Sequence, residues 1–391
     1  MFKLVREARE TPLSRVCVLG VGDAGSRAVE GVLGGMSGEG PLAVINTDAR
    51  ALARSKAATK LQIGRRGGAD ASTGGDPALG GAAAERDLEM IRGLFSDCDA
   101  LILAAGLGGG TGTGVSPVVL SAARASGLLT LAVVTTPFSF EGPGRGRIAQ
   151  DGLQAVAGAA DFTAVIPNDR LFAGAGAEGD VASAFARADE ALAAGICSLW
   201  HMLAQPMLIG VDAGGFMALA SKGSGVCSFG FGTAAGPGRA QAAARALVDG
   251  PVFEAGAALR SCGAALVCVC GSHDMTLQEV GDAVDAVSAV LPAGGDLQIG
   301  TVINEAWRDR IFVSAYLADN RRTVTPVARD GHRAPDPAVS RKSSRSKGAQ
   351  EELKFDGIAG RGRFNNMAAT ILDGEDLDTP TFIRHGIVLE K

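Results

Sequence analysis

The residues best suited to chemistry in this chain form a glycine-rich stretch at positions 104–117. Glycine lets a backbone approach a ligand closely and adopt positive φ. The apolar run Ala100–Ala105 predicts a buried parallel strand before the stretch, and Val115–Ser126 predicts a helix after it, with Pro117 in its first turn. Because helix N-termini bind anions, this order predicts a phosphate cradle. Its members are Gly106, Gly108, Gly109, Gly110, Thr111, Gly112, Thr113 and Gly114.

A second glycine motif, GxGxxG at positions 20–25, follows the apolar strand Arg15–Leu19. This order is typical of a dinucleotide site, and Asp48 stands where a ribose ligand would lie. An NAD-dependent oxidoreductase is therefore an open alternative. One dinucleotide needs only one pyrophosphate cradle, however, and Gly74 and Gly75 add a third glycine element. Three such elements favour a longer phosphate chain. No Lys-Ser or Lys-Thr follows the glycines at 108–114, so this is not a Walker loop.

Strands and helices alternate through the first half of the chain, which predicts an α/β fold with a doubly wound parallel sheet. The predicted strands are Arg15–Leu19, Leu42–Ile45, Ala100–Ala105, Leu128–Val134 and Phe162–Ile166. The predicted helices are Ser26–Leu33, Ala83–Leu94, Val115–Ser126 and one that ends at Ala157.

A long helix is predicted from the N-cap Asp180 to about Ala204. Phe185 and Asp189 stand four residues apart and so share a face of this helix. They fit either a core Phe beside a solvated Asp or a base-binding pair. In the second case the carboxylate accepts from N1–H and the exocyclic amine of guanine, while Phe185 stacks on the ring. Adenine lacks that donor pair and would be rejected.

A second α/β unit follows Pro206, and the segment Met207–Phe216 is predicted as a loop that leads into it. Its predicted elements are the strands Ser224–Phe231, Ala264–Cys270, Gln298–Ile303 and Ile311–Tyr316 and the helices Gly238–Val248 and Leu277–Leu291. Val327–Gln350 is polar and carries six basic against two acidic residues, which predicts a disordered basic linker. The acidic and apolar mixture of Thr370–Arg384 predicts a peptide that orders on a partner.

The composition limits the partners and the compartment. The chain has 391 residues, a net charge of −5 and 47% hydrophobic residues, a balance that argues against nucleic-acid binding. Residues 1–12 alternate in charge without an apolar core, and no apolar stretch reaches eighteen residues, so neither a secretory signal nor a membrane span is expected. The seven Cys show no CxxC spacing and no metal site is predicted, which favours a reduced, cytoplasmic protein.

Taken together, these motifs resemble those of the FtsZ family, the bacterial relatives of tubulin. The most specific motif is the tubulin-type phosphate sequence GGGTGTG at 108–114. Supporting matches are Asn46–Asp48, Pro137–Gly142, Ile166–Asp169 and Gly300–Ile303. The resemblance implies a Rossmann-like GTP-binding domain (13–179) after a flexible terminus (1–12), a central helix (180–205), a second α/β domain (206–325), a linker (326–352) and a tail (353–391).

The resemblance also implies roles for particular residues and for partners. Glu141 and Arg145 would contact ribose and phosphates, Asn168 the nucleoside, and Phe185 and Asp189 the guanine of GTP or GDP, with Mg²⁺ carried by the nucleotide. Further nucleotide contacts are expected at Gly20, Gly22, Asp23, Ala24, Gly25, Arg27, Asn46, Asp48, Gly74, Gly75 and Pro137. The tail would bind a membrane tether such as FtsA at the division site through Asp376, Leu377, Asp378, Pro380, Phe382, Ile383 and Arg384.

Two departures from the family stand out. Its first phosphate loop is nearly all glycine followed by Asn, whereas here Asp23 brings a negative charge that Arg27 is expected to offset. Its catalytic loop, which completes the nucleotide site of the next subunit, has polar or acidic residues where Gly210, Asp212 and Gly215 stand. Since only Asp212 remains, we expect slow or absent GTP hydrolysis, because a positioned acid–base group contributes about 10²–10⁴ in rate.

Two functions within this family follow from the sequence. The first is a divergent GTP-binding cytoskeletal protein that assembles head to tail into filaments and binds a membrane tether through its tail. The second is a non-hydrolysing regulatory paralogue that assembles together with an orthodox FtsZ. An NAD-dependent oxidoreductase is the third and most remote alternative function.

Overall fold

The computed structural model describes residues 15–33, 40–65, 72–173, 180–205, 207–211, 213–222, 225–292 and 294–318, and the pairs 371–372 and 375–376. The chain divides into two units, residues 1–326 and 327–391. The predicted flexible terminus, the basic linker and most of the tail lie outside the described residues. Within the second unit, β12 (Ile371–Leu372) pairs antiparallel with β13 (Glu375–Asp376).

An eleven-stranded sheet forms the centre of the first unit, with strand order β3-β2-β1-β4-β5-β6-β8-β11-β9-β10-β7. The strands from β3 to β8 in that order run parallel, and β11 pairs antiparallel with both β8 and β9. The strands are β1 (Val16–Val21), β2 (Leu42–Asn46), β3 (Thr59–Gln62), β4 (Ala100–Gly106), β5 (Leu129–Thr136), β6 (Phe162–Pro167), β7 (Met207–Ile209), β8 (Val226–Ala235), β9 (Ala264–Gly271), β10 (Asp296–Ile303) and β11 (Arg310–Ala318). The predicted α/β fold with a doubly wound parallel sheet is confirmed.

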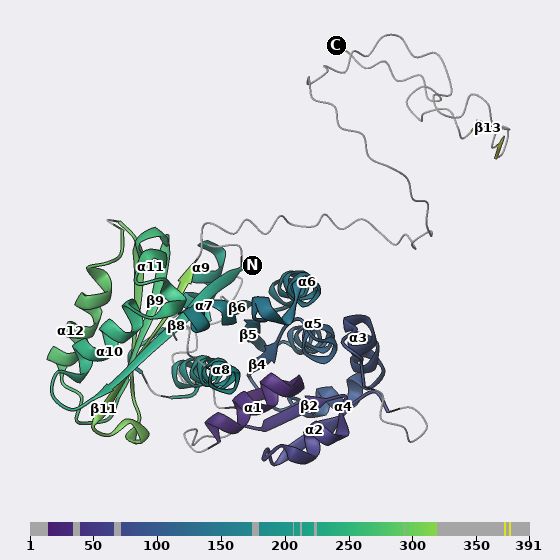
Figure 1. Ribbon diagram of the computed structural model, residues 1–391, viewed down its shortest axis with the longest axis horizontal. Helices are drawn as coiled ribbons and strands as arrows, with labels where there is room; N and C mark the ends of the chain where they lie inside the picture. Colours follow the sequence, from purple (N-terminus) through teal and green to yellow (C-terminus); the bar gives the residue numbers. More distant parts are fainter. Residues whose placement is uncertain are drawn as a thin grey trace, which may run out of the picture. The chain divides into compact units, whose positions relative to one another are not determined.

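Helices cover both faces of the parallel strands, and each face has its own core. On one face α1 and α8 pack side by side, and on the other lie α3, α4, α5 and α6 (Figure 1). The helices are α1 (Gly22–Val32), α2 (Ala49–Arg54), α3 (Pro77–Arg86), α4 (Leu88–Gly93), α5 (Gly110–Ala125), α6 (Pro143–Ala159), α7 (Asn168–Ala173), α8 (Val181–Ala204), α9 (Ala213–Lys222), α10 (Arg239–Val248), α11 (Ala257–Ser261) and α12 (Leu277–Ser288). Short 3₁₀ turns span Ser139–Glu141, Pro251–Phe253 and Glu305–Trp307.

The long central helix is confirmed. The Asp180 side chain accepts a hydrogen bond from the Ser183 backbone N–H at 2.8 Å, which caps the first turn of α8. Leu192, Ile196 and Leu199 are buried on one face of α8, as their helical spacing predicts. This face holds the helix against the sheet, so that the start of α8 stands beside α1.

Two helices begin earlier than predicted. The helix expected at Val115 starts at Gly110, so Pro117 lies in its interior, and the helix expected at Ser26 starts at Gly22. Close packing explains the first difference, since a Cβ at Gly112 would lie 2.2 Å from the carbonyl oxygen of Gly106. Gly110, Gly112 and Gly114 of this stretch are therefore part of the helix, because glycine allows its first turns to pack this closely.

Two local predictions in other parts of the chain were wrong. The helix expected at Ala83–Leu94 is broken at Asp87 into α3 and α4, and the Asp87 carboxylate accepts from the backbone N–H of Gly64 at 2.6 Å. The segment Met207–Phe216, expected as a loop, contains β7 and the start of α9. β7 pairs antiparallel with β10, and a pairing across almost 100 residues leaves no local pattern in the sequence.

Candidate functional site

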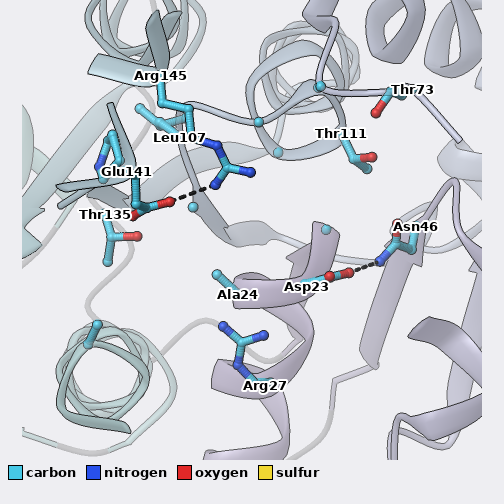
Figure 2. Close-up of a pocket in the computed structure, with 18 of the residues that line it drawn as sticks. Asp23, Ala24, Arg27, Asn46, Thr73, Leu107, Thr111, Thr135, Glu141 and Arg145 are labelled. Carbon is cyan, nitrogen blue, oxygen red and sulfur yellow. Dashed lines mark hydrogen bonds and ion pairs between the residues drawn. The ribbon is translucent and has the colours of Figure 1, made fainter. Parts of the chain in front are cut away.

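A cavity of about 430 Å³ opens where β1, β2, β4 and β5 end (Figure 2). The sheet reverses its strand order between β1 and β4, and ligands of open α/β sheets bind at such a switch point. The predicted site residues that line the cavity are Gly22, Asp23, Ala24, Arg27, Asn46, Asp48, Gly75, Gly106, Gly109, Gly110, Thr111, Gly112, Pro137, Glu141, Arg145, Asn168, Phe185 and Asp189. Segments that are far apart in the sequence therefore meet in one place.

The start of α1 forms one wall of the cavity. Gly22 has φ of +72°, which a side chain would strain, and its carbonyl accepts from the Ser26 hydroxyl at 2.7 Å. The Asp23 carboxylate accepts from the side-chain amide of Asn46 at 2.7 Å. The predicted offset of Asp23 by Arg27 is wrong, because Arg27 donates instead to Asp189. Among the described residues, Asp23 thus meets an amide donor and no cation.

The start of α5 forms the opposite wall and supplies the phosphate cradle. Its first N–H groups have no partner within the helix and lie at the positive end of a helix of 16 residues. Gly108 has φ of +101°, and its N–H donates to the Thr113 hydroxyl at 2.9 Å. The hydroxyls of Thr111 and Thr47 are 2.8 Å apart. These bonds stabilise the turn, and its residues Gly109, Gly110, Thr111 and Gly112 line the cavity.

Glu141 and Arg145 stand above this cradle and form an ion pair. Arg145 donates to Glu141 at 2.6 Å, and the second carboxylate oxygen accepts from the Phe138 backbone N–H at 2.9 Å (Figure 2). The Arg145 side chain is 57% exposed. Because more than half of its side chain is exposed, the guanidinium can turn to an anion in the cavity.

The start of α8 supplies the apolar wall. Phe185 meets Phe138 edge-to-face with ring centroids 5.1 Å apart, and Ala188 and Leu192 line the same side of the cavity. Asp189 accepts from Arg27 Nε at 2.6 Å. An aromatic ring beside a carboxylate fits a flat heterocycle that carries N–H donors.

Asn168 gives an independent sign of a ligand. It is 6% exposed and lines the cavity, and its Oδ1 has no hydrogen-bond partner among the described residues. Buried acceptors are almost always paired, so this oxygen fits a donor from a bound molecule, such as a ribose hydroxyl.

Comparisons with known proteins agree with this geometry. Residues 15–176 match the Tubulin/FtsZ family GTPase domain, and residues 225–319 match the FtsZ family C-terminal domain. The cell division protein FtsZ of Pseudomonas putida is 30% identical over 398 residues, with 98% of this chain and 99% of that protein covered. The chain belongs to the tubulin/FtsZ family. 

Two further relatives extend the comparison. FtsZ of Bartonella bacilliformis is 35% identical over 329 residues, which cover 83% of this chain and 55% of that protein. A solved structure described as an empty FtsZ dimer of M. jannaschii is 30% identical with a TM-score of 0.70, and the likeness covers 82% of this chain and 96% of that one. This FtsZ-like chain therefore has the tubulin-type fold that the sequence predicted.

Six of the predicted nucleotide contacts do not line the cavity. Gly20 and Gly25 pack backbone to backbone, since a Cβ on Gly20 would lie 2.3 Å from the Gly25 carbonyl oxygen. Gly114 similarly allows α5 to approach Pro77 of α3. Gly108 and Thr113 bond to each other, and Gly74, with open space around it, lies next to the lining residue Gly75.

Sequence reasoning missed several lining residues: Thr47, Ser72, Thr73, Leu107, Thr135, Ala188 and Leu192. Four of them adjoin a predicted residue in the sequence, as Thr47 adjoins Asn46, and this adjacency was the available signal. Asp48 lines the cavity but also caps α2, because its carboxylate accepts from the Arg50 N–H at 2.8 Å. A carboxylate used in this way argues against its role as the ribose ligand of a dinucleotide site.

The remaining predicted residues lie elsewhere or outside the described residues. Asp212 and the tail residues Leu377, Asp378, Pro380, Phe382, Ile383 and Arg384 are outside them, whereas Asp376 lies in β13. Across the described ranges, no group of three or more His, Cys, Asp or Glu side chains could hold a metal ion. Nor does any helix within those ranges have the length and apolar character to cross a bilayer.

Proposed function

We propose that this chain binds GTP and GDP in the cavity between α1, α5 and α8 and assembles head to tail into filaments that hydrolyse GTP slowly or not at all. The observation that carries this proposal is the convergence of the α5 cradle and the Phe185–Asp189 wall on one cavity. The cradle fits phosphate, and the wall fits a base with N–H donors. A cavity of about 430 Å³ matches the size of small-molecule and cofactor sites.

Within the cavity, each end would hold one part of the nucleotide. The N–H groups of Gly109, Gly110 and Thr111 would donate to phosphate oxygens, and Arg145 would leave Glu141 to reach them. Asn168 Oδ1 would accept from the ribose. Mg²⁺ bound with the nucleotide would neutralise phosphate charge, which matters here because the described lining residues include Asp23, Asp48, Glu141 and Asp189 against two arginines.

Exposed apolar side chains support assembly. Leu208 of β7 is 72% exposed, Ile209 is 46% exposed and Met217 of α9 is 52% exposed. They flank residues 210–215, so a second subunit that covers them would place its nucleotide beside Asp212 of this subunit. In this arrangement Asp212 would polarise the attacking water. The absence of polar side chains at Gly210 and Gly215 would slow that step.

The same two glycines favour a second candidate function. A subunit that contributes a weak catalytic loop would stabilise or cap filaments of an orthodox FtsZ. The tail, if it binds a tether such as FtsA, would bring either kind of filament to the membrane at the division site. Co-sedimentation with an orthodox FtsZ from the same cell, but not alone, would favour this candidate.

The deciding experiment measures phosphate release from GTP and light scattering against protein concentration, with Mg²⁺. The proposal expects GTP-dependent scattering above a critical concentration, with a per-subunit rate of phosphate release that stays low. A rate that rises steeply with assembly would show that Asp212 is enough to complete the hydrolytic site. Absence of GDP and GTP binding by titration calorimetry would refute the proposal, and binding of NADH in its place would support an oxidoreductase.

A further inference from the structure

Cys17 of β1 and Cys98, which lies just before β4, are two thiols that meet although they are far apart in the sequence. All seven cysteines of the chain are free thiols. The Cys17 thiol donates a hydrogen bond to the sulfur of Cys98, so the two side chains are in direct contact. Cys17 is fully buried, whereas Cys98 is partly exposed. The pair therefore connects a core position with the solvent.

The parallel pairing of β1 with β4 brings the two thiols together. The Asp99 N–H donates to the Arg15 carbonyl at 2.8 Å, which extends this ladder toward Cys98. Sγ of Cys17 lies 3.8 Å from the carbonyl oxygen of Leu94, in the turn that connects α4 with β4. Cys98 packs against the same hydrophobic core that contains Cys17. The contact between the thiols is thus a consequence of the sheet topology.

The surroundings of the pair favour a negative charge on Cys98. The hydrogen bond from Cys17 lowers the pKa of Cys98, and the positive charge of Arg15 adds to this effect, while partial burial and the charges of Asp97 and Asp99 oppose it. The pKa of Cys17 is raised well above its usual range, because its thiol takes part in this hydrogen bond and is buried. Cys98 is therefore the thiol that ionises first, and the thiolate is the nucleophilic form of cysteine.

We propose that Cys98 is an oxidation site for hydrogen peroxide, and that Cys17 is the resolving thiol that converts the oxidised Cys98 into a disulfide. A partly exposed thiol beside a second thiol is the arrangement that redox-sensitive cysteines share. Oxidation begins at Cys98, because Cys17 is closed off from solvent. This inference goes beyond the proposed function and does not depend on nucleotide binding.

The oxidation takes place in two steps. The Cys98 thiolate attacks one oxygen of the peroxide, the O–O bond breaks, and the leaving hydroxide takes a proton from solvent to form water. The Cys17 sulfur then attacks the sulfur of the sulfenic acid on Cys98, the S–O bond breaks, and the Cys17 proton leaves with the hydroxide as a second water. The two thiols lose two electrons in total, and one peroxide is reduced to two waters.

Formation of the disulfide requires a movement of Cys98. Disulfide sulfur atoms are about 2.05 Å apart, which is closer than a hydrogen bond between thiols allows. Cys17 is fixed within β1, whereas Cys98 lies between the turn after α4 and the start of β4, outside both elements. Neighbouring strands are about 4.8 Å apart, within the range of about 4.4–6.8 Å that disulfides span between Cα atoms. The backbone of the sheet can therefore stay in place.

The test treats the full chain with hydrogen peroxide and follows it by mass spectrometry of the intact chain and by peptide mapping without reduction. We expect the first product to be a single chain that is lighter by two hydrogens, with Cys17 joined to Cys98, and dithiothreitol should reverse it. Cys98→Ser should lower the rate of thiol loss by about tenfold or more. Cys197→Ser is the matched control and should change neither rate nor product, because Cys197 is also partly exposed but burial raises its pKa to about 12.

Cys17→Ala separates the two roles. Without the resolving thiol, oxidation of Cys98 should stop at the sulfenic acid, which dimedone labels in this variant but not in the wild type. Circular dichroism checks that the variant is folded, and Cys17→Ser takes its place if the alanine variant is not. Equal dimedone labelling of the wild type, a disulfide between two chains, a first disulfide between other cysteines or an unchanged rate in Cys98→Ser would each overturn the inference.

Discussion

The Asn46 side-chain amide donates to the Asp23 carboxylate at 2.7 Å on the wall of the cavity that adjoins the phosphate cradle. This bond orients Asp23 without neutralising it, since an amide carries no charge. A bound phosphate chain would therefore lie near a negative charge. The arrangement predicts a weaker affinity for nucleotides than a glycine loop would give.

Asp23→Asn is expected to strengthen GDP binding about fivefold at low salt, because two like charges about 5 Å apart repel by roughly 1 kcal/mol even at the dielectric constant of water. The asparagine keeps an oxygen that can accept from Asn46. Titration calorimetry at two salt concentrations measures the effect, which should shrink as salt rises. Asp151→Asn, on the exposed side of α6, removes the same charge outside the cavity and should change nothing. Weaker binding by Asp23→Asn would show that Asp23 contacts the ligand favourably.

Adding polar side chains at Gly210 and Gly215 is expected to raise GTP hydrolysis. A Cβ on Gly210 meets nothing within 4 Å, so Gly210→Asn should be tolerated, whereas a Cβ on Gly215 would lie 2.7 Å from Gln298 Oε1 and 2.6 Å from Val211 Cγ1. The variant that we propose is Gly210→Asn, Gly215→Asp and Gln298→Ala together. Its phosphate release in assembled filaments should rise by about tenfold or more.

The control for this triple variant is Gly210→Ala, Gly215→Ala and Gln298→Ala, which adds the same crowding without polar groups. If both triple variants assemble and neither hydrolyses GTP faster than the wild type, the loop is not what limits the rate.

Glycine substitutions should change stability in opposite directions at two sites. A Cβ on Gly25 would lie 2.2 Å from the Ala104 carbonyl oxygen, so Gly25→Ala should destabilise the fold by about 1–3 kcal/mol through overpacking. Gly281 in α12 has nothing within 4 Å of an added Cβ, so Gly281→Ala should stabilise by roughly 0.5–1 kcal/mol through helix propensity. Urea unfolding measures both. A stable Gly25→Ala variant would show that α1 can move away from β4.

Stability should fall in mild acid because of His201. This side chain is 1% exposed on α8, its Nε2 lies 2.9 Å from Asn304 Nδ2, and burial lowers its pKa to about 4. Its pKa in the unfolded chain is about 6.5, so the unfolded state binds more protons between pH 6.5 and 4. The contribution of neutral His201 is complete above pH 6.5 and should decrease by roughly 2–3 kcal/mol as the pH falls to 4.

Urea unfolding at pH 7 and pH 4.5 tests this pH dependence. His201→Gln should lower stability at pH 7 but flatten the dependence on pH, whereas His273→Gln, at a site whose side chain is 81% exposed, should leave the dependence unchanged. An unaltered slope in His201→Gln would assign the acid sensitivity to carboxylates.

The sequence by itself determined most of the strands, the central helix and the cradle, because these follow from local patterns, whereas β3 and β7 were not predicted. A short apolar run that ends at glycines, such as Ala100–Gly106, favours a strand buried in a sheet, and the spacing of Leu192, Ile196 and Leu199 favours a helix with one apolar face. The glycines at 108–114 specify close backbone approach wherever they lie. The position of the site at the strand ends therefore followed from the order of the elements.

Only the tertiary structure decided which side chains face each other and where the helices begin. Gly110 is helical because α5 packs against Thr73 and Gly106, and that contact overrides the weak helix propensity of glycine. Arg27 pairs with Asp189 rather than Asp23 because the register of α1 on α8 is set by close contact at Gly31 and Ala193. Such pairings depend on side-chain packing between distant segments, which leaves no periodic trace in the sequence.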